Sequence, residues 1–265
     1  MVVHDVLETL LGRPPRNPIY KALWFPYILK YCNTPKINYI VLGPSLEENL
    51  LQLTPALKGY VHSIDMPYFF EPASDFTPCR DGTLRFGSIG IGHKTKGTHL
   101  LFELAQHFKS VHSRYQASFQ HIGGISEAIL LDAGNQNAVT VYAGGNSLKR
   151  EDFEKALREI DYAVFFYPSD SYKLRASGAI FDALSFQKPV IAIRNSYFGY
   201  CFDAMGDIGY LCSDYSEMLA TIDDILNNWD LCRYALQQKN IRTGRERFGL
   251  NETAGRIGNI IKSRK

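Results

Sequence analysis

Residues 176–193, ASGAIFDALSFQKPVIAI, join the start of a predicted helix to an apolar strand within one short stretch. Ser177 and Gly178 open the helix, whose first N–H groups lack partners inside the helix and therefore attract phosphate or carboxylate groups. Asp182 lies one turn further along the same face, where its carboxylate could accept hydrogen bonds from a sugar hydroxyl. The run 190–193 is apolar and partly β-branched, as in a parallel strand covered on both faces.

The same residues also fit a simpler interpretation. Lys188 and Pro189 are predicted to end the helix, and a capped helix of this kind occurs in any α/β domain. Asp182 would then be a solvated acid near the positive end of its helix. The stretch alone leaves a ligand site and this structural role open.

Strand and helix patterns alternate on both sides of this stretch. Predicted strands lie at 84–89, 119–122, 139–142, 162–167 and 209–212, and predicted helices lie at 98–108, around 153–160 and around 218–226. Ser147 is the predicted cap of the second of these helices, and residues 194–208, with Gly199 and Gly206, are predicted to form a loop. Strands that alternate with helices in this way form a doubly wound parallel α/β sheet of the Rossmann-like type.

The first 75 residues predict only part of a second α/β layer. Short strands are predicted at 39–42 and 60–64, and helices at 5–11, 20–31 and 46–51. Two or three strands are too few for an independent sheet of this kind. Residues 71–81 carry two prolines and few apolar side chains, which is typical of a linker. We therefore predict a partial N-terminal α/β domain at 1–75 and a Rossmann-like domain at 76–265.

Charge and cysteine patterns exclude several classes of protein. The net charge is +2 and no block of like charges occurs, which argues against nucleic acid as the main partner. The five cysteines are scattered without a CxxC pair, so we expect neither a disulfide framework nor a zinc site, and a cytoplasmic location. We expect no signal peptide and no transmembrane segment, because the chain start has no basic flank with an apolar core and no long apolar run follows.

The glycine turn 90–98, GIGHKTKGT, joins a predicted strand to a predicted helix. It is not a dinucleotide fingerprint, which would need glycine at Thr95, nor a P-loop, which would need lysine at Thr98. Ligands bind at this edge of open α/β sheets, so Gly90, Gly92 and the lysines of the turn predict a phosphate site. The alternative is an ordinary glycine turn with solvated lysines.

Basic residues in two loops favour an anion site at this edge. Lys94 and Lys96 lie in the glycine turn, and Lys173 and Arg175 lie in the loop after the strand 162–167. Cations beside a helix N-terminus favour anion binding more than either feature does alone. Lys173 also fits a solvated side chain on a mobile surface loop.

Motifs of common catalytic and metal sites are missing from the sequence. It contains no GxSxG, no HExxH, no Cys/His cluster and no Asp-x-Asp pair. Protein donors must then meet the charge of a bound phosphate, so we expect neither a metal nor another cofactor. Val2 and Val3 could close a further strand, and His4, directly after them, is the candidate catalytic residue, although a lone histidine is more often structural.

Three stretches, in this order, resemble the GT-B glycosyltransferases, particularly the retaining family 4 type: GIGHKTKGTHLL, SLKREDFEKALREIDYAVFFYPSD and SGAIFDALSFQKPVIA. The resemblance covers about 84–212, and VHSIDMPYFFEP at 61–72 resembles the interdomain segment of that family. Residues 1–60 would then be the later part of the N-terminal acceptor domain.

The resemblance implies roles for single residues. Lys96 would contact the donor diphosphate, Ser177 and Gly178 would offer backbone amides to the phosphates, and Asp182 would hold the donor ribose. With the glycine turn and the basic loop, the predicted donor-phosphate site comprises Gly90, Gly92, Lys96, Arg175, Ser177 and Gly178.

Three positions depart from the family's pattern. Leu174 stands where the first of two paired acids is expected, Ile91 where an arginine usually follows the glycine, and Gln187 where a glycine usually precedes Lys-Pro. The first departure removes an expected contact to the donor sugar. A non-catalytic nucleotide-sugar-binding or partner subunit is therefore the alternative to an enzyme.

Together with the missing Asp-x-Asp pair, the resemblance implies a metal-independent glycosyltransferase of the retaining hexosyltransferase type. Its expected partners are a nucleotide-sugar donor and a glycan or lipid-linked acceptor, with peripheral association at the inner face of the membrane. A nucleotide-dependent epimerase of similar layout would need the dinucleotide fingerprint that Thr95 breaks.

Overall fold

The structure, a computed structural model, describes residues 1–25, 27, 29, 37–70, 78, 81–126, 129, 138–143 and 148–262. The chain forms two compact units. The first comprises Met1–Phe69, Tyr172–Ser177 and Glu246–Lys265, and the second comprises Phe70–Ser171 and Gly178–Arg245. A loop from the middle of the chain and the C-terminal residues thus pack with the N-terminal residues, and the domain division at 1–75 and 76–265 stays a prediction.

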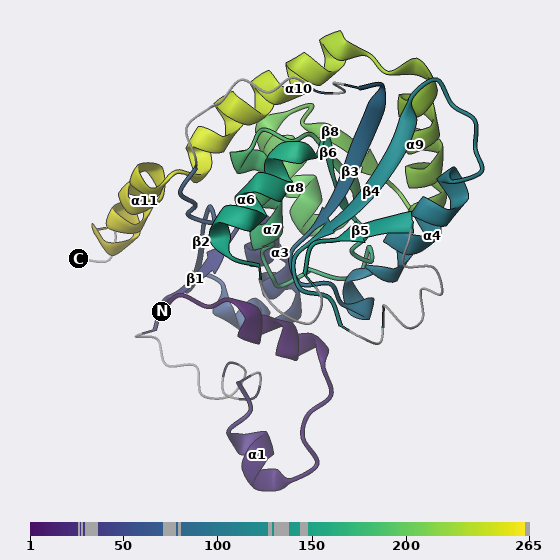
Figure 1. The fold of residues 1–265 in the computed structure, drawn as a ribbon. Helices are drawn as coiled ribbons and strands as arrows, with labels where there is room; N and C mark the ends of the chain where they lie inside the picture. The colour runs from purple at the N-terminus through teal and green to yellow at the C-terminus, as the bar shows by residue number, and fades with distance from the viewer. Residues whose placement is uncertain are drawn as a thin grey trace. The chain divides into compact units, whose positions relative to one another are not determined.

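The second unit is built on a six-stranded parallel sheet with the order β5-β4-β3-β6-β7-β8 (Figure 1). Its strands are β3 (Thr83–Ile89), β4 (Gln116–Ile122), β5 (Val139–Val141), β6 (Tyr162–Phe165), β7 (Val190–Ile193) and β8 (Gly209–Cys212). Its described helices are α4 (His99–Phe108), α6 (Arg150–Glu159), α7 (Gly178–Ser185), α8 (Ser196–Met205), α9 (Tyr215–Asn228) and α10 (Leu231–Gly244). From β3 the chain adds strands on one side and then returns to add β6, β7 and β8 on the other, so the predicted doubly wound sheet is confirmed. The direction of winding reverses between β3 and β6, which is the switch point of such a sheet.

A row of aromatic side chains crosses the centre of this sheet. Phe86 of β3 pairs in register with Phe119 of β4 and Tyr162 of β6, and its ring centre lies 5.4 Å and 5.7 Å from theirs. Phe108 of α4 stacks on Phe119 at 6.0 Å. A slip of one residue would turn a strand's ring to the opposite face, so the row fixes the register of the central strands. Each ring pair adds about 0.5–1.5 kcal/mol beyond its buried area.

The predicted loop 194–208 is wrong, because most of it forms α8. The side-chain oxygen of Asn195 accepts the N–H of Phe198 at 2.9 Å and caps the helix. The helix buries a stripe of side chains, namely Tyr197, Phe198, Cys201 and Met205. Gly199 sits inside the helix with nothing near its Cβ position, and Gly206 ends it with a φ of +81°. The two glycines looked like loop signals, but only the second one terminates the helix.

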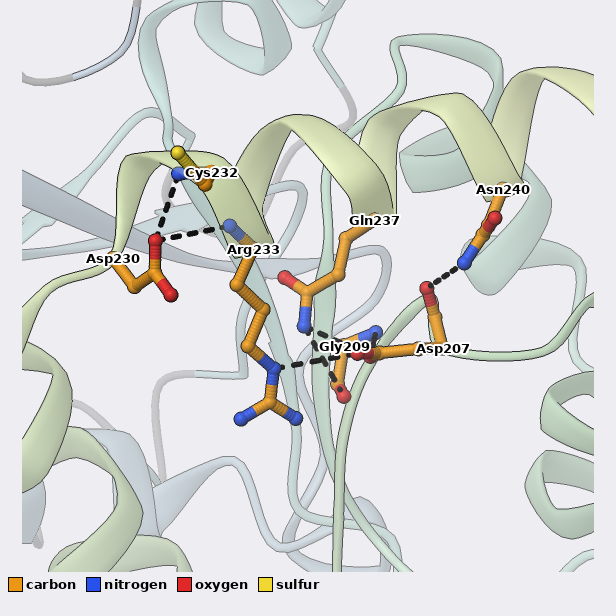
Figure 2. A network of polar contacts seen from close by, with 7 residues as sticks. All are labelled: Asp207, Gly209, Asp230, Cys232, Arg233, Gln237 and Asn240. Carbon is orange, nitrogen blue, oxygen red and sulfur yellow. Dashed lines mark hydrogen bonds and ion pairs between the residues drawn. The ribbon is translucent and has the colours of Figure 1, made fainter.

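A polar network around Asp207 fixes α10 at the start of β8 (Figure 2). The carboxylate of Asp207 accepts hydrogen bonds from Arg233 at 3.3 Å and from Gln237 at 2.9 Å, and its carbonyl accepts one from Asn240 at 2.9 Å. Asp230 caps the helix by accepting two backbone N–H groups. This network lies at the amino end of β8, so it does not occupy the carboxyl edge where ligands bind in such sheets.

The first unit contains a two-stranded parallel sheet formed by β1 (Tyr39–Leu42) and β2 (Val61–Ile64). Its other described elements are the 3-10 helices Asp5–Leu11 and Pro55–Leu57, α1 (Pro18–Ala22), α3 (Pro44–Leu53) and α11 (Leu250–Lys262). Val2 bridges to Ile40 beside β1. Both predicted strands are confirmed, whereas the helix predicted at 5–11 is a 3-10 helix, and α1 covers only the start of the helix predicted at 20–31.

A buried acid holds the C-terminal segment to this small sheet. Asp65 directly follows β2 and is fully buried, and its carboxylate binds Arg247 at 2.8 Å and Arg256 at 2.5 Å. The N–H of Tyr68 donates to the carbonyl of Phe248 at 2.9 Å. Because an unpaired buried carboxylate is strongly unfavourable, the two arginines fix α11 in the first unit.

Parts of the sequence-based prediction concern residues outside the described ones. The cap at Ser147, most of the linker 71–81 and the later part of the helix 20–31 fall there. Within the described part of the chain, no helix is both long enough and apolar enough to cross a membrane.

Two glycines of α8 give opposite predictions. Gly199→Ala should raise the free energy of unfolding by about 0.5–1 kcal/mol. Alanine loses less conformational entropy than glycine when the helix forms, and no atom lies within 4 Å of the added Cβ. Gly206→Ala should lower it by about 1–2 kcal/mol, because its left-handed φ disfavours a Cβ. Urea denaturation measures both, and a loss of stability in Gly199→Ala would contradict the helix.

Candidate functional site

The switch point brings two predicted phosphate-binding elements together. Gly90 follows β3 with a φ of +96°, and a Cβ built on it would lie 3.5 Å from the Cβ of Ala179. Ala179 directly follows Gly178, the first residue of α7. The glycine turn therefore lies against the first turn of α7, whose leading N–H groups have no acceptor within the helix. Ligands bind at this edge of an open α/β sheet.

The glycine turn is packed against the ends of both strands that flank β3. On one side, the N–H of Gly92 donates to the carbonyl of Gly124, just after β4, at 2.7 Å. On the other side, a Cβ on Gly97 would lie only 2.4 Å from the carbonyl oxygen of Phe166, just after β6. Gly97 also has a φ of +70°, which costs a residue with a Cβ about 1–2 kcal/mol. Glycine at this position lets the turn close and thereby sets the position of Lys96.

Lys96 lies above the end of β3. Its Nζ is 5.9 Å from the centre of the Tyr167 ring, which lies beyond the end of β6. Burial lowers the pKa of His121, at the end of β4, and the charge of Lys96 lowers that pKa further. β4 and β6 flank β3 in the sheet, so the turn that carries Lys96 lies between the ends of these two strands. Lys96 is half-buried, whereas Lys94 is exposed.

Asp182 lies one turn into α7, on the partly exposed side of the helix. The opposite side holds α7 in the unit, since Ile180 and Leu184 are fully buried. The Asp182 side chain is 23% exposed, and its Oδ1 lies 3.9 Å from a guanidinium nitrogen of Arg150. Arg150 also binds Glu154 at 2.5 Å, so this long and solvated ion pair contributes little to stability.

The end of α7 explains one departure from the family's pattern. The helix ends at Ser185, earlier than the predicted Lys188, and Gln187 adopts a left-handed φ of +54°. The N–H of Lys188 donates to the Ala183 carbonyl at 3.0 Å, as in helices that glycine terminates. The buried Oε1 of Gln187 accepts two hydrogen bonds from Arg242 of α10, at 3.2 Å and 3.0 Å. These charge-assisted bonds offset the roughly 1–2 kcal/mol that the left-handed conformation costs.

The loop 172–177, between β6 and α7, packs with the first unit. Leu174 is fully buried, and its N–H donates to the carboxylate of Glu8 at 3.1 Å. The carbonyl of Lys173 accepts a hydrogen bond from Asn49 at 2.8 Å, while its side chain is exposed. The backbone here is thus held by partners far away in the sequence.

Three predicted site residues belong to the first unit. Arg175 is half-buried, with its guanidinium 6.0 Å from the centre of the Tyr172 ring, and Ser177 is buried directly before α7. His4 is half-buried at the start of a 3-10 helix, where its carbonyl accepts the N–H of Leu7 at 3.1 Å. The other predicted site residues belong to the second unit: Gly90, Gly92, Lys96, Gly178 and Asp182.

Two polar residues at the carboxyl edge of the sheet escape sequence-based prediction. Asn195 follows β7, and its buried Nδ2 has no hydrogen-bond partner among the described residues. Tyr167 follows β6, and its ring stacks on Phe198 at 5.3 Å. Each of them carries a polar group and lies two residues after an apolar strand, which is the sequence pattern that could have identified them. Asn195 falls in the segment 194–208, for which the sequence predicts a loop.

Solved structures with this arrangement of elements include several glycosyltransferases. The chain aligns with a mutant of S. aureus TarM in complex with UDP at a TM-score of 0.63 and 17% identity, over 84% of this chain and 43% of TarM. It aligns with WaaG at a TM-score of 0.64 and 13% identity, over 91% of this chain and 68% of WaaG. It aligns with Anabaena HepE, in complex with UDP and glucose, at a TM-score of 0.60 and 15% identity, over 85% of this chain and 63% of HepE.

The fold is that of the GT-B glycosyltransferases. At these identities the likeness establishes the fold alone. The chain spans less than two thirds of the length of TarM and HepE. No protein-family model and no curated protein matches the sequence.

The stability of the empty site is expected to depend little on Asp182. Asp182→Asn should change the free energy of unfolding by less than about 1 kcal/mol, because its ion pair is long and solvated. Asp161→Ala is the structural comparison, since this buried carboxylate accepts the N–H of Arg85 at 2.8 Å, and its loss should cost about 1–3 kcal/mol. Urea denaturation of both variants measures the difference, and equal losses would make Asp182 a structural acid.

Proposed function

We propose that this chain is a glycosyltransferase that moves a sugar from a nucleoside diphosphate donor to a glycan or lipid-linked acceptor. The observation that carries the proposal is the contact of the glycine turn with α7, where Gly90 meets Ala179 at the switch point. Lys96 lies in the same glycine turn, with its Nζ 5.9 Å from the centre of the Tyr167 ring, and Asp182 lies one helical turn into α7. The GT-B fold supports this function, and the TarM and HepE structures contain UDP.

Each group would meet a different part of the donor. Lys96 and the amides at the start of α7 would hold the diphosphate, and Asp182 would accept hydrogen bonds from the ribose. Among the residues that the structure describes, no group of three or more His, Cys, Asp or Glu side chains could hold a metal ion. We propose that fixed protein donors meet the charge of the departing diphosphate, in a metal-independent and retaining reaction. We further propose that Arg175 and Ser177 contribute to binding of the donor phosphates and that His4 is a catalytic residue.

A non-catalytic nucleotide-sugar-binding or partner subunit is the second candidate. Leu174, at the position of the family's first acid, is fully buried and offers no carboxylate to a donor sugar. Ile91, at the position of the usual arginine, is apolar and 73% exposed. Both departures remove groups that would act on the sugar or phosphates, while Lys96 and Asp182 stay in place.

The acceptor also bears on location. A lipid-linked acceptor would bring the protein to the inner face of the cytoplasmic membrane as a peripheral protein, and we propose that location together with the function. A glycan acceptor would not require it.

Two measurements on the purified chain test the function. Thermal shifts with UDP, GDP and ADP should identify one preferred base, since a ligand at 100 times its Kd stabilises by about 2.7 kcal/mol. The matching nucleotide sugars are then assayed for hydrolysis or transfer. Turnover supports the enzyme, binding without turnover supports the binding subunit, and the absence of binding would contradict both.

Two lysines of the glycine turn provide a matched pair for binding. Lys96→Ala should weaken nucleoside diphosphate binding by about 1.5–3 kcal/mol, the range for a charge-assisted hydrogen bond. Lys94→Ala, an exposed lysine of the same turn, should weaken it by less than about 1 kcal/mol. Isothermal titration calorimetry measures both, and a larger effect of Lys94→Ala would contradict the assignment.

Asp182→Asn should weaken the same binding by about 1.5–3 kcal/mol, because a ribose hydroxyl loses a charged acceptor. The comparison with its small effect on stability is informative. An Asp182→Asn protein that is destabilised but keeps its affinity would show that the carboxylate has no part in binding.

A further inference from the structure

His121 is a buried histidine beside the glycine turn that the proposed function does not use. It belongs to β4, is 1% exposed and pairs in register with Ser88 of β3. Side chains alternate along a strand, so His121 lies on the same face of the sheet as Phe119, the face that α4 covers. It is thus enclosed directly beside the strand end above which Lys96 lies.

One carbonyl group links the His121 ring to the glycine turn. The Nε2 of His121 lies 3.3 Å from the carbonyl oxygen of Gly124, which also accepts the N–H of Gly92 at 2.7 Å. A Cβ on Gly92 would lie 3.0 Å from the same Nε2. The imidazole therefore donates a hydrogen bond to the group that anchors the turn and also packs against the turn's backbone.

The second ring nitrogen of His121 can take up a proton. Nδ1 is buried and has no hydrogen-bond partner among the described residues. With the ring proton on Nε2, Nδ1 carries a lone pair that no donor meets, and a proton on Nδ1 would have no acceptor among the described residues, so the empty site favours the neutral ring. Burial lowers the pKa of His121, the Gly124 carbonyl acts in the opposite direction, and the charge of Lys96, from the turn, lowers the pKa further. Burial and the charge of Lys96 thus both favour the neutral ring in the empty site.

We propose that His121 takes up a proton on Nδ1 when a diphosphate binds over the glycine turn, and so acts as a second cation behind Lys96. The inference rests on the proposed function. The negative charge of the diphosphate would offset that of Lys96 and favour the imidazolium, and the proton would come from solvent. His121 is a positioning residue in this scheme, because it acts on the ligand through the turn and its charge.

The expected pH dependence follows from this change. The pKa of His121 is higher in the complex than in the empty protein, so affinity rises as the pH falls through the interval between the two values. Above that interval the ring is neutral in both states, and affinity no longer depends on its protonation. A shift of one unit in pKa corresponds to about a tenfold change in affinity.

The first experiment measures the link between Lys96 and His121 without any ligand. NMR titration of ring-labelled protein gives the pKa of His121, whose signals are identified by their loss in His121→Gln. Lys96→Ala removes the positive charge that a bound diphosphate would offset. It should therefore raise the pKa of His121. Lys94→Ala is the control and should leave it unchanged. An unchanged His121 in Lys96→Ala would overturn the electrostatic link and with it the proposal.

The second experiment measures proton uptake during binding. UDP-glucose is the probe, because its doubly substituted diphosphate has no proton to exchange near neutral pH. Calorimetry in two buffers of different ionisation enthalpy should show proton uptake by the wild type, and binding about threefold to tenfold tighter at pH 6 than at pH 8. His121→Gln keeps an amide donor for Gly124, and it should bind without proton uptake and without this pH dependence.

The outcomes separate this inference from the proposed function. Binding without proton uptake, or uptake that persists in His121→Gln, would overturn the role of His121 and leave the transferase proposal intact. An absence of UDP-glucose binding by the wild type would contradict the proposed function in its UDP form and this inference with it. His121→Leu removes the donor to Gly124, so its affinity should fall at both pH values.

Discussion

The close approach of one glycine turn to two neighbouring strands is the constraint on which the candidate site depends. Gly97 lies so close to the Phe166 carbonyl that no side chain fits there. On the other side, the N–H of Gly92 donates a hydrogen bond to the Gly124 carbonyl. A turn fixed at both flanks has one position above its strand. The backbone position of Lys96 is therefore set by the packing of the turn before any charge is considered, and the proposed stabilisation of a diphosphate would require such a fixed position.

Much of the fold follows from local sequence signals. The runs 39–42, 190–193 and 209–212 are strands with the predicted bounds, because short apolar stretches between turn residues have few other stable forms. The sequence predicts a loop in place of α8 because Gly199 resembles a helix breaker, although an open helix position tolerates glycine at a cost of only about 1 kcal/mol. The grouping of 172–177 with the first unit could not be predicted, since Glu8 and Asn49 hold that loop from remote parts of the chain.

In the candidate site, too, some residues follow from local sequence signals and others depend on contacts between remote parts of the chain. The placement of Gly90, Lys96 and Gly178 at the carboxyl edge could be predicted, because a residue after a parallel strand, or at the start of the helix that follows one, lies at that edge whatever the strand order. Tyr167 and His121 could not, because their relevance depends on β4 and β6 being the neighbours of β3. Leu174 looked like the loss of an acid in the sequence, and in the structure it is a core residue of the first unit.

The left-handed Gln187 at the end of α7 has an evolutionary consequence. Its conformation is the one that glycine adopts at no steric cost, and here Arg242 on another helix offsets the strain through two hydrogen bonds. The two positions are therefore coupled in sequence space. Among relatives of this chain, a side chain at 187 should co-vary with a donor at 242, and glycine at 187 should release 242 to vary.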